Sequence, residues 1–251
     1  METTDDFFIP ENRVYNIEEE DYKQAIPVIY TMKAIARMTY KSLYVIDYFR
    51  KNFFYVSDNP IFLCGYQPEE VLKMGYSFYF NQVPKNELKM LIEINKAGFL
   101  FYTQFTIEER MKMFVSFDCH LLNNKEQTLI NHKLTPILLD DNGNIWLAAC
   151  VVSLSSNQQA GNIEAHMDGR KEYWTYSLES HQWKLHEEIM LDSREKEILL
   201  YSAQNMTEEQ IAYKIHLEKQ TIKFHKQKLF KQLGVNNMYA AIAIAANKKM
   251  I

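Results

Sequence analysis

Apolar residues recur at helical spacing near the carboxyl end of the chain. With Ile222 placed at zero on a helical wheel, Leu229 and Leu233 fall close beside it and form one stripe. The opposite side carries lysines and glutamines around the apolar residue Phe224. The pattern predicts a helix with a buried stripe and a cationic face. An exposed aromatic ring among cations is unusual for a plain solvated surface.

The residues before this helix predict how it is held. Ala212 is small, so two helix backbones can cross closely there, and Ile215 and Leu217 can fill the angle between them. Two helices joined at a wide angle by a short turn form a helix-turn-helix, which places its second helix in the major groove of DNA. Taken alone, the lysine-rich helix could also be an ordinary surface helix. The small and branched residues before it favour the helix-turn-helix.

Residues 190–246 resemble the LuxR-type (NarL-like) DNA-binding domain of bacterial transcription regulators. The sequence departs from that family at Asn205 and His216, where glycine is common, and at Glu218, where the family has a serine that caps the recognition helix. Met238 and Ala240 also replace charged residues of the last helix. The segments that carry the resemblance are Leu191–Leu199, Thr207–Ala212, Thr221–His225 and Lys231–Val235.

The resemblance implies a regulator that binds double-stranded DNA as a homodimer, and it gives the recognition helix its contacts. It implies that Lys223, Phe224 and Gln227 face bases, where an apolar group can touch a thymine methyl. The last helix, residues 237–247, either pairs two subunits or completes the core. The other predicted DNA-binding residues, most of them nearer phosphates, are Lys219, Gln220, Thr221, His225, Lys226, Lys228 and Lys231.

The pattern in the amino-terminal two thirds of the chain predicts an antiparallel sheet with inserted helices, so the whole chain is an α+β protein with an all-α carboxyl-terminal domain. Two strands, a helical insert and a three-stranded meander resemble the PAS sensor fold, on the evidence of residues 65–72 and 136–146. The predicted strands are residues 42–47, 52–57, 115–121, 128–139 and 145–154, and the predicted inserted helices are residues 60–66, 68–75 and 84–97.

The expected domains are a helical extension over residues 1–39, a PAS-like sensor over 40–155, a linker with a small hairpin over 156–189 and the DNA-binding domain over 190–251. Residues 18–25 and 27–38 read as two helices separated by Pro27. We expect Trp174 and Trp183 of the hairpin to pack on one of the domains or on a partner subunit, because a two-stranded hairpin is marginal alone.

Charge is divided unevenly along the chain. The whole chain carries a formal charge of −4; from residue 190 onward there are ten basic and six acidic residues, which gives +4 there and leaves −8 for the remainder. A basic end on an acidic body fits a DNA-binding module joined to a module with another task. No signal-peptide pattern, apolar membrane span or paired-cysteine motif is visible, so we expect a cytoplasmic protein without membrane or metal.

The remaining chemistry is sparse. Nucleophile, phosphate-loop and metalloprotease motifs are absent from the sequence, so no enzyme activity is predicted. The sequence does not predict a cofactor. His120 and His132 are candidate haem ligands, but the favoured interpretation is that both are surface histidines. Cys64 lacks the motif of a flavin-binding cysteine. The sensor half either binds a small ligand or serves as a dimerisation surface. A receiver domain phosphorylated on an aspartate such as Asp47 is a less favoured alternative.

Overall fold

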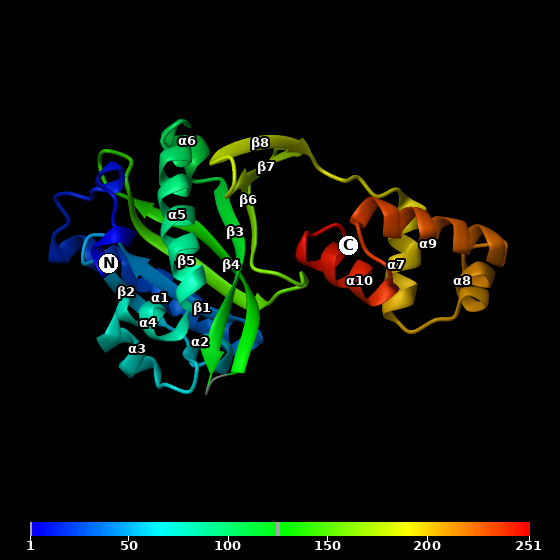
Figure 1. Cartoon of the computed structure of the whole chain (residues 1–251), viewed down its shortest axis with the longest axis horizontal. Coiled ribbons are helices and arrows are strands. Elements are labelled where there is room, and N and C mark those ends of the chain that lie inside the picture. Colours follow the sequence, from blue (N-terminus) through cyan, green and yellow to red (C-terminus); the bar gives the residue numbers. More distant parts are fainter. Residues whose placement is uncertain (1, 124–125) are drawn as a thin grey trace. The chain divides into compact units, whose positions relative to one another are not determined.

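The structure, a computed structural model, describes residues 2–123 and 126–251 and divides into two compact units, Met1–His186 and Glu187–Ile251 (Figure 1). The first unit is an antiparallel sheet with helices and the second is entirely helical, as the sequence predicts. In the described part of the chain, no helix is both long and apolar enough to cross a membrane.

The first unit is built on one eight-stranded sheet in the order β2-β1-β5-β4-β3-β6-β7-β8. Each register that the structure defines is antiparallel, and β1 lies between β2 and β5. The five strands predicted for the sensor are therefore confirmed, with small shifts at their ends. Their bounds are β1 (Ser42–Asp47), β2 (Asn52–Val56), β3 (Met113–Asn123), β4 (Glu126–Leu139) and β5 (Ile145–Leu154).

The helical insert between β2 and β3 follows the predicted punctuation. Pro60 and Pro68 each occupy the first turn of a helix, where the missing N–H costs nothing. Gly75 ends α3 at φ +56°, and a Cβ there would lie 2.8 Å from Asn52 Oδ1, so glycine is required. Helix α4 was not predicted from the sequence. The bounds are α2 (Pro60–Leu63), α3 (Pro68–Met74), α4 (Ser77–Gln82), α5 (Lys85–Tyr102) and α6 (Ile107–Arg110).

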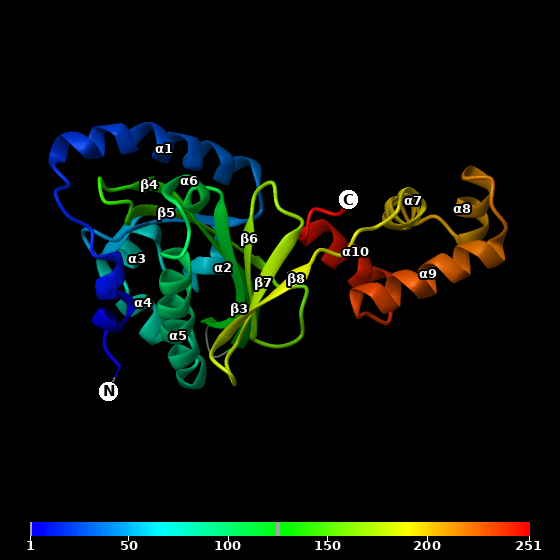
Figure 2. The same cartoon turned by 90° about the horizontal axis from the view of Figure 1, so that it is seen from above.

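The amino-terminal segment is part of the first unit's core. Two short 3-10 helices, η1 (Thr4–Phe7) and η2 (Pro10–Asn12), precede a single helix, α1 (Glu19–Met38). The expectation of two helices was wrong because α1 continues through Pro27, since proline removes only one backbone donor and apolar packing on both sides of it holds the helix. Helix α1 covers the face of the sheet opposite to α3, α4 and α5 (Figure 2).

Residues 161–187 extend the sheet. Strand β6 (Gly161–Met167) pairs with β3, and β7 (Glu172–Ser177) and β8 (Gln182–Glu187) follow it in the same sheet. Most of the segment expected to be a linker with a small hairpin, residues 156–189, therefore belongs to the sheet. Alternate residues of β6 are buried and complete the core. As expected, the hairpin tryptophans pack on a domain: Trp183 stacks on Phe101 of α5, with ring centroids 4.5 Å apart.

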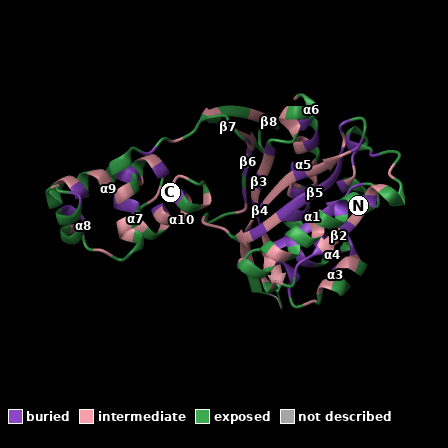
Figure 3. Cartoon of the chain, turned by 180° about the vertical axis from the view of Figure 1, so that it is seen from behind, coloured by how far each residue is buried: buried purple, intermediate pink, exposed green. Residues whose placement is uncertain are grey.

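The second unit contains four helices: α7 (Ser193–Ala203), α8 (Glu208–Lys214), α9 (Lys219–Leu233) and α10 (Met238–Asn247). The two predicted capping boxes are present: Asp192 and Glu195 begin α7, and Thr207 and Gln210 begin α8. Its core is a small apolar cluster separate from that of the first unit, as the buried residues of Figure 3 show.

Candidate nucleic-acid interface

Helix α9 is anchored through the predicted stripe. Ile222 and Leu229 are completely buried and Leu233 is 8% exposed. Ala212 of α8 is also buried, and the backbone N–H of Leu217 donates to its carbonyl across the turn, at 2.9 Å. The small residue and the apolar stripe therefore fix α9 against α8 and α7, which is the arrangement that a helix-turn-helix requires.

The turn between α8 and α9 carries the two departures expected to weaken it. His216 adopts φ +54°, a left-handed conformation in which glycine is unstrained. Glu218 stands at the N-cap of α9 in extended conformation, and its side chain makes no capping hydrogen bond. Asn205 adopts the expected left-handed conformation after α7, at φ +60°.

The face of α9 away from the core is open to solvent. Phe224 is 64% exposed, and Lys223 and Gln227 are exposed beside it. The only ring contact of Phe224 among the described residues is with the neighbouring His225, at 5.9 Å between centroids, and the apolar core of the unit does not include it. The structure brings the three residues predicted to face bases onto one accessible surface, here called the α9 outer face (Lys223, Phe224 and Gln227).

Three of the predicted phosphate-contacting lysines are already paired with carboxylates. Lys219 pairs with Glu209 of α8, and the hydrogen bond raises the pKa of the lysine. Lys226 Nζ lies 2.9 Å from Glu208 Oε1, and the lysine side chain is partly buried. Lys226 lies four residues after Ile222, which places it beside the buried stripe. Its partial burial could therefore have been predicted from the helical wheel.

Lys228 belongs to a different environment from the one predicted. Its Nζ lies 2.6 Å from Oε1 of Glu195, whose side chain is 1% exposed, and 3.5 Å from Oδ2 of Asp192. The hydrogen bond to Glu195 raises the pKa of Lys228 above its usual value. Sequence reasoning identified Glu195 only as a capping residue and missed this second role.

The predicted site residues therefore separate into two groups. In the described part of the chain, Lys223 and Lys231 form no ion pair, so their charges face solvent uncompensated. The exposed residues of the predicted set are Lys219, Gln220, Lys223, Phe224, Gln227, Lys228 and Lys231, and the partly buried ones are Thr221, His225 and Lys226.

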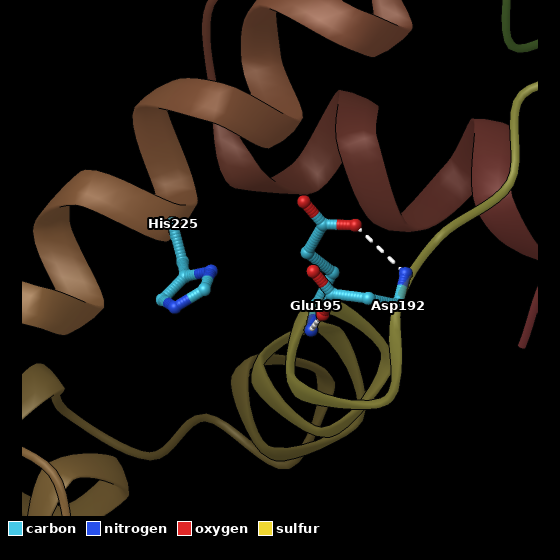
Figure 4. Close-up of side chains that lie close together, drawn as sticks. All are labelled: Asp192, Glu195 and His225. Atoms are coloured by element: carbon cyan, nitrogen blue, oxygen red, sulfur yellow. Dashed lines mark hydrogen bonds between the residues drawn. The ribbon is translucent and has the colours of Figure 1, made fainter.

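His225 points toward the capping carboxylates at the start of α7 (Figure 4). Ligand atoms of Asp192, Glu195 and His225 lie within 4.8 Å of one another, a spacing that a metal ion can use. The ammonium group of Lys228 already supplies the positive charge between the two carboxylates. We therefore assign no metal to this cluster, and we read it as the contact that holds α9 to α7.

The first unit encloses a cavity of about 90 Å³ between the sheet and α5. Aromatic and aliphatic side chains form most of its wall. Three of its lining residues also have a buried polar group without a hydrogen-bond partner among the described residues: the hydroxyls of Tyr48 and Tyr102 and Nδ1 of His132. Burial lowers the pKa of His132 to about 3, so the ring is neutral, and its other nitrogen contacts the hydroxyl of Tyr44.

The histidines and the cysteine considered as cofactor ligands lie in different environments. His132 is 4% exposed, so its reading as a surface histidine was wrong. It lies two residues after Ile130 on the same side of β4, and both side chains line the cavity. His120 is partly exposed and its Nδ1 lies 2.6 Å from Glu87 Oε1. Cys64 is a buried free thiol whose pKa burial raises to about 12, so it is a poor nucleophile.

Comparison with known proteins identifies the second unit. Residues 190–245 match the family of bacterial regulatory proteins described as the luxR family. This range contains α7, α8 and α9 and most of α10, so the second unit holds a LuxR-family helix-turn-helix domain. A comparison with curated proteins gives no match.

Solved structures similar to the whole chain are more distant. A phage VqmA–DPO complex has 12% identity over 94% of this chain and 92% of that chain, with a TM-score of 0.31. A VqmA bound to DPO has 14% identity over 88% of each chain, with a TM-score of 0.31. A Vibrio cholerae VqmA dimer without target DNA has 14% identity over 94% of this chain and 89% of that chain, with a TM-score of 0.30. Similarities at this level support no argument about fold or ligand.

Proposed function

We propose that the chain is a bacterial transcription regulator, in which the LuxR-family domain binds duplex DNA through α9 and the first unit is a PAS-like sensor. The observation that carries the proposal is the α9 outer face, where Lys223, Phe224 and Gln227 lie exposed on the helix that follows the turn. Lysine and glutamine can donate hydrogen bonds to base edges, and the phenyl ring suits a thymine methyl.

Phosphate contacts come from the residues that flank this surface. Lys231 lies two turns along α9 from Lys223 on the same side, and its charge is not paired among the described residues. Lys219, Lys226 and Lys228 each have a carboxylate partner that phosphate would have to displace. Of the lysines on α9, Lys223 and Lys231 therefore contribute most of the electrostatic attraction.

The test of DNA binding is a mobility-shift titration of the full chain at increasing salt. Phosphate contacts release counterions, so we expect affinity for duplex DNA to fall roughly 100-fold or more between about 50 and 200 mM salt. A control with Lys196→Ala, an exposed lysine on α7 with no ion pair among the described residues, should keep the same slope. Binding that does not change with salt would contradict the proposal.

The first unit supports a sensor by its element order and its cavity. Strands β1 and β2, a helical insert and the meander β3-β4-β5 are the arrangement on which the PAS resemblance rests. In the described residues, no Asp, Glu, Lys or Arg side chain lines the cavity, and His132 is neutral. A charged ligand would lose its hydration without gaining a counter-charge, so the ligand we propose is a small uncharged molecule that satisfies Tyr102 and His132.

We expect Gly98→Leu to fill this cavity without harming the fold. Gly98 lies on α5, lines the cavity, and has open space where its Cβ would stand. Replacing a helical glycine also stabilises the helix by about 1 kcal/mol. Native mass spectrometry of the purified full chain should show a non-covalent adduct in the parent protein and in Gly98→Ala but none in Gly98→Leu. An adduct of equal occupancy in all three proteins would place the ligand elsewhere.

Helix α5 connects the cavity wall to the last strands before the DNA-binding unit. Its inner side lines the cavity, whereas Glu93 on its other side accepts a hydrogen bond from the hydroxyl of Tyr176, at 3.0 Å. Trp183 Nε1 donates to the carbonyl of Ala97, at 3.4 Å. A ligand that shifts α5 therefore acts directly on β7 and β8, and we propose this as the route of regulation.

The regulator we propose is cytoplasmic, has no enzymatic activity and works as a homodimer on an inverted repeat, since two-fold proteins match two-fold sites. The receiver alternative finds no support. A receiver needs alternating strands and helices and an accessible aspartate, but Asp47 is 1% exposed and accepts hydrogen bonds from Tyr22, Phe49 and Arg50. These contacts make Asp47 the anchor of the β1-β2 turn.

A further inference from the structure

Helix α1 presents apolar side chains to solvent along its outer face. Ile26 is 46% exposed, Tyr30 68% and Met38 75%, and Tyr40 just after the helix is 95% exposed. Single exposed apolar residues are ordinary, but several on one face of one helix mark an interaction surface. The residues of this α1 outer face, which lie opposite the buried side of the helix, are Glu20, Lys23, Gln24, Pro27, Tyr30, Thr31, Ala34, Arg37 and Met38, with Ile26 at the edge.

The other side of α1 is fixed to the body of the unit. Tyr22, Ala25 and Met32 are buried against the core, and the hydroxyl of Tyr22 donates to Asp47 at 2.6 Å. Arg50 stacks on the ring of Tyr22, with its guanidinium carbon 3.8 Å from the ring centroid. The exposed side chains therefore stand on a rigid platform, which is the form that a preorganised interface takes.

Charge along α1 is polarised. Glu19, Glu20 and Asp21 occupy its first turn, where Lys23 forms an exposed ion pair with Glu20, whereas Lys33 and Arg37 lie in its second half. The helix dipole favours this order, but it does not account for the apolar residues between. Among the described residues Arg37 has no carboxylate within ion-pair distance, so it remains available to a partner.

We propose that a second copy of this chain covers the α1 outer face, with the two α1 helices packed antiparallel about a two-fold axis. An axis near Val28 and Ile29 sets Glu20 of one copy opposite Arg37 of the other and Pro27 opposite Tyr30, and each contact occurs twice. A parallel pair would bring like charges together along its whole length. The inference gives the homodimer of the proposed function its interface in the sensor unit.

Charge-reversal variants of the full chain test this pairing. In sedimentation-velocity experiments at low salt, Glu20→Arg alone and Arg37→Glu alone should each weaken self-association about tenfold, because both place like charges opposite each other in a homodimer. An equimolar mixture of the two variants should restore the dimer, since the unlike chains carry opposite charges at both contacts. Failure of the mixture to restore it, or a parent protein that is monomeric, would overturn the proposal.

A crosslinking experiment locates the axis. The three native cysteines, Cys64, Cys119 and Cys150, are buried, so an added surface thiol reacts alone. A short bis-maleimide should link Tyr30→Cys chains into dimers at high yield, because residue 30 lies near the axis. Tyr40→Cys is the matched control: copies of residue 40 would be about 35 Å apart at 1.5 Å per residue. Equal crosslinking at both positions would exclude the antiparallel arrangement.

A failure of the α1 interface can be distinguished from a failure of the proposed DNA binding. The α1 variants should retain the thermal stability of the parent protein and its salt-dependent binding to duplex DNA that carries one half-site, because α1 lies in the other unit. If duplex binding is absent in the parent protein, the proposed function fails whatever the state of the dimer. If duplex binding is present and the mixed variants fail to pair, only this inference fails.

Discussion

Lys223→Ala is expected to lower affinity for the preferred DNA sequence by about 1 to 3 kcal/mol, or roughly 5- to 150-fold, while lowering affinity for unrelated duplexes much less. The reason is its exposed position on the α9 outer face, with no carboxylate paired to it among the described residues. A lysine that contacts a base edge contributes to discrimination between sequences, whereas one that contacts phosphate contributes equally to all of them.

Lys231→Ala provides the matched comparison for this prediction. Lys231 has the same side-chain chemistry on the same helix and lies nearer the phosphates in our assignment, so its removal should weaken all duplexes to a similar extent and reduce the salt slope by about 1. Competition mobility-shift assays with specific and unrelated duplexes measure both quantities. If Lys223→Ala and Lys231→Ala gave the same pattern, Lys223 would be a phosphate contact and our assignment of the base-reading residues would be wrong.

Lys228→Ala is expected to lower the stability of the DNA-binding unit and its urea midpoint, because it leaves the buried carboxylate of Glu195 without its counter-charge. The Glu195 side chain is 1% exposed and that of Lys228 is 43% exposed, so water can replace the ammonium only in part. The backbone N–H of Asp192 still donates to Glu195 Oε2 at 2.8 Å, which limits the loss. Lys231→Ala, without such a partner, should leave stability nearly unchanged.

Urea unfolding of the full chain can separate this effect from the sensor unit. The three tryptophans, Trp146, Trp174 and Trp183, all lie in the first unit, so their fluorescence reports that unit alone. Circular dichroism also reports the four helices of the second unit. Lys228→Ala should lower the urea midpoint of the dichroism transition and leave the midpoint of the fluorescence transition unchanged.

Removing both charges with Glu195→Gln and Lys228→Met should recover part of the lost stability, because no unpaired charge then remains buried. An unchanged dichroism transition in Lys228→Ala would show that Lys228 does not hold α9 to α7. It would also return Lys228 to the group of lysines free to contact phosphate.

The order of elements was predictable because it depends on short-range signals. Caps such as Asp192 and Thr207, the prolines that begin α2 and α3, and the spacing of Ile222, Leu229 and Leu233 act within one or two turns of chain. The single helix α1 was missed because Pro27 is a local signal for interruption, and packing on the sheet overrode it. The extension of the sheet by β6 was missed because the residues of β3 with which it pairs lie 43 (Asp118 and Gly161) to 54 (Met113 and Met167) positions earlier in the chain.

The amino-acid sequence by itself determined the helix-turn-helix and the exposure of Lys223, Phe224 and Gln227, since periodicity alone puts these residues opposite the buried stripe. Only the tertiary structure decided which lysines remain free. The partners of Lys226 and Lys228 lie 18 to 36 residues away on other helices, and a charge on a helical wheel does not show what packs against it. The same holds for the cavity around His132 and Tyr102, whose walls come from strands and helices that only folding brings together.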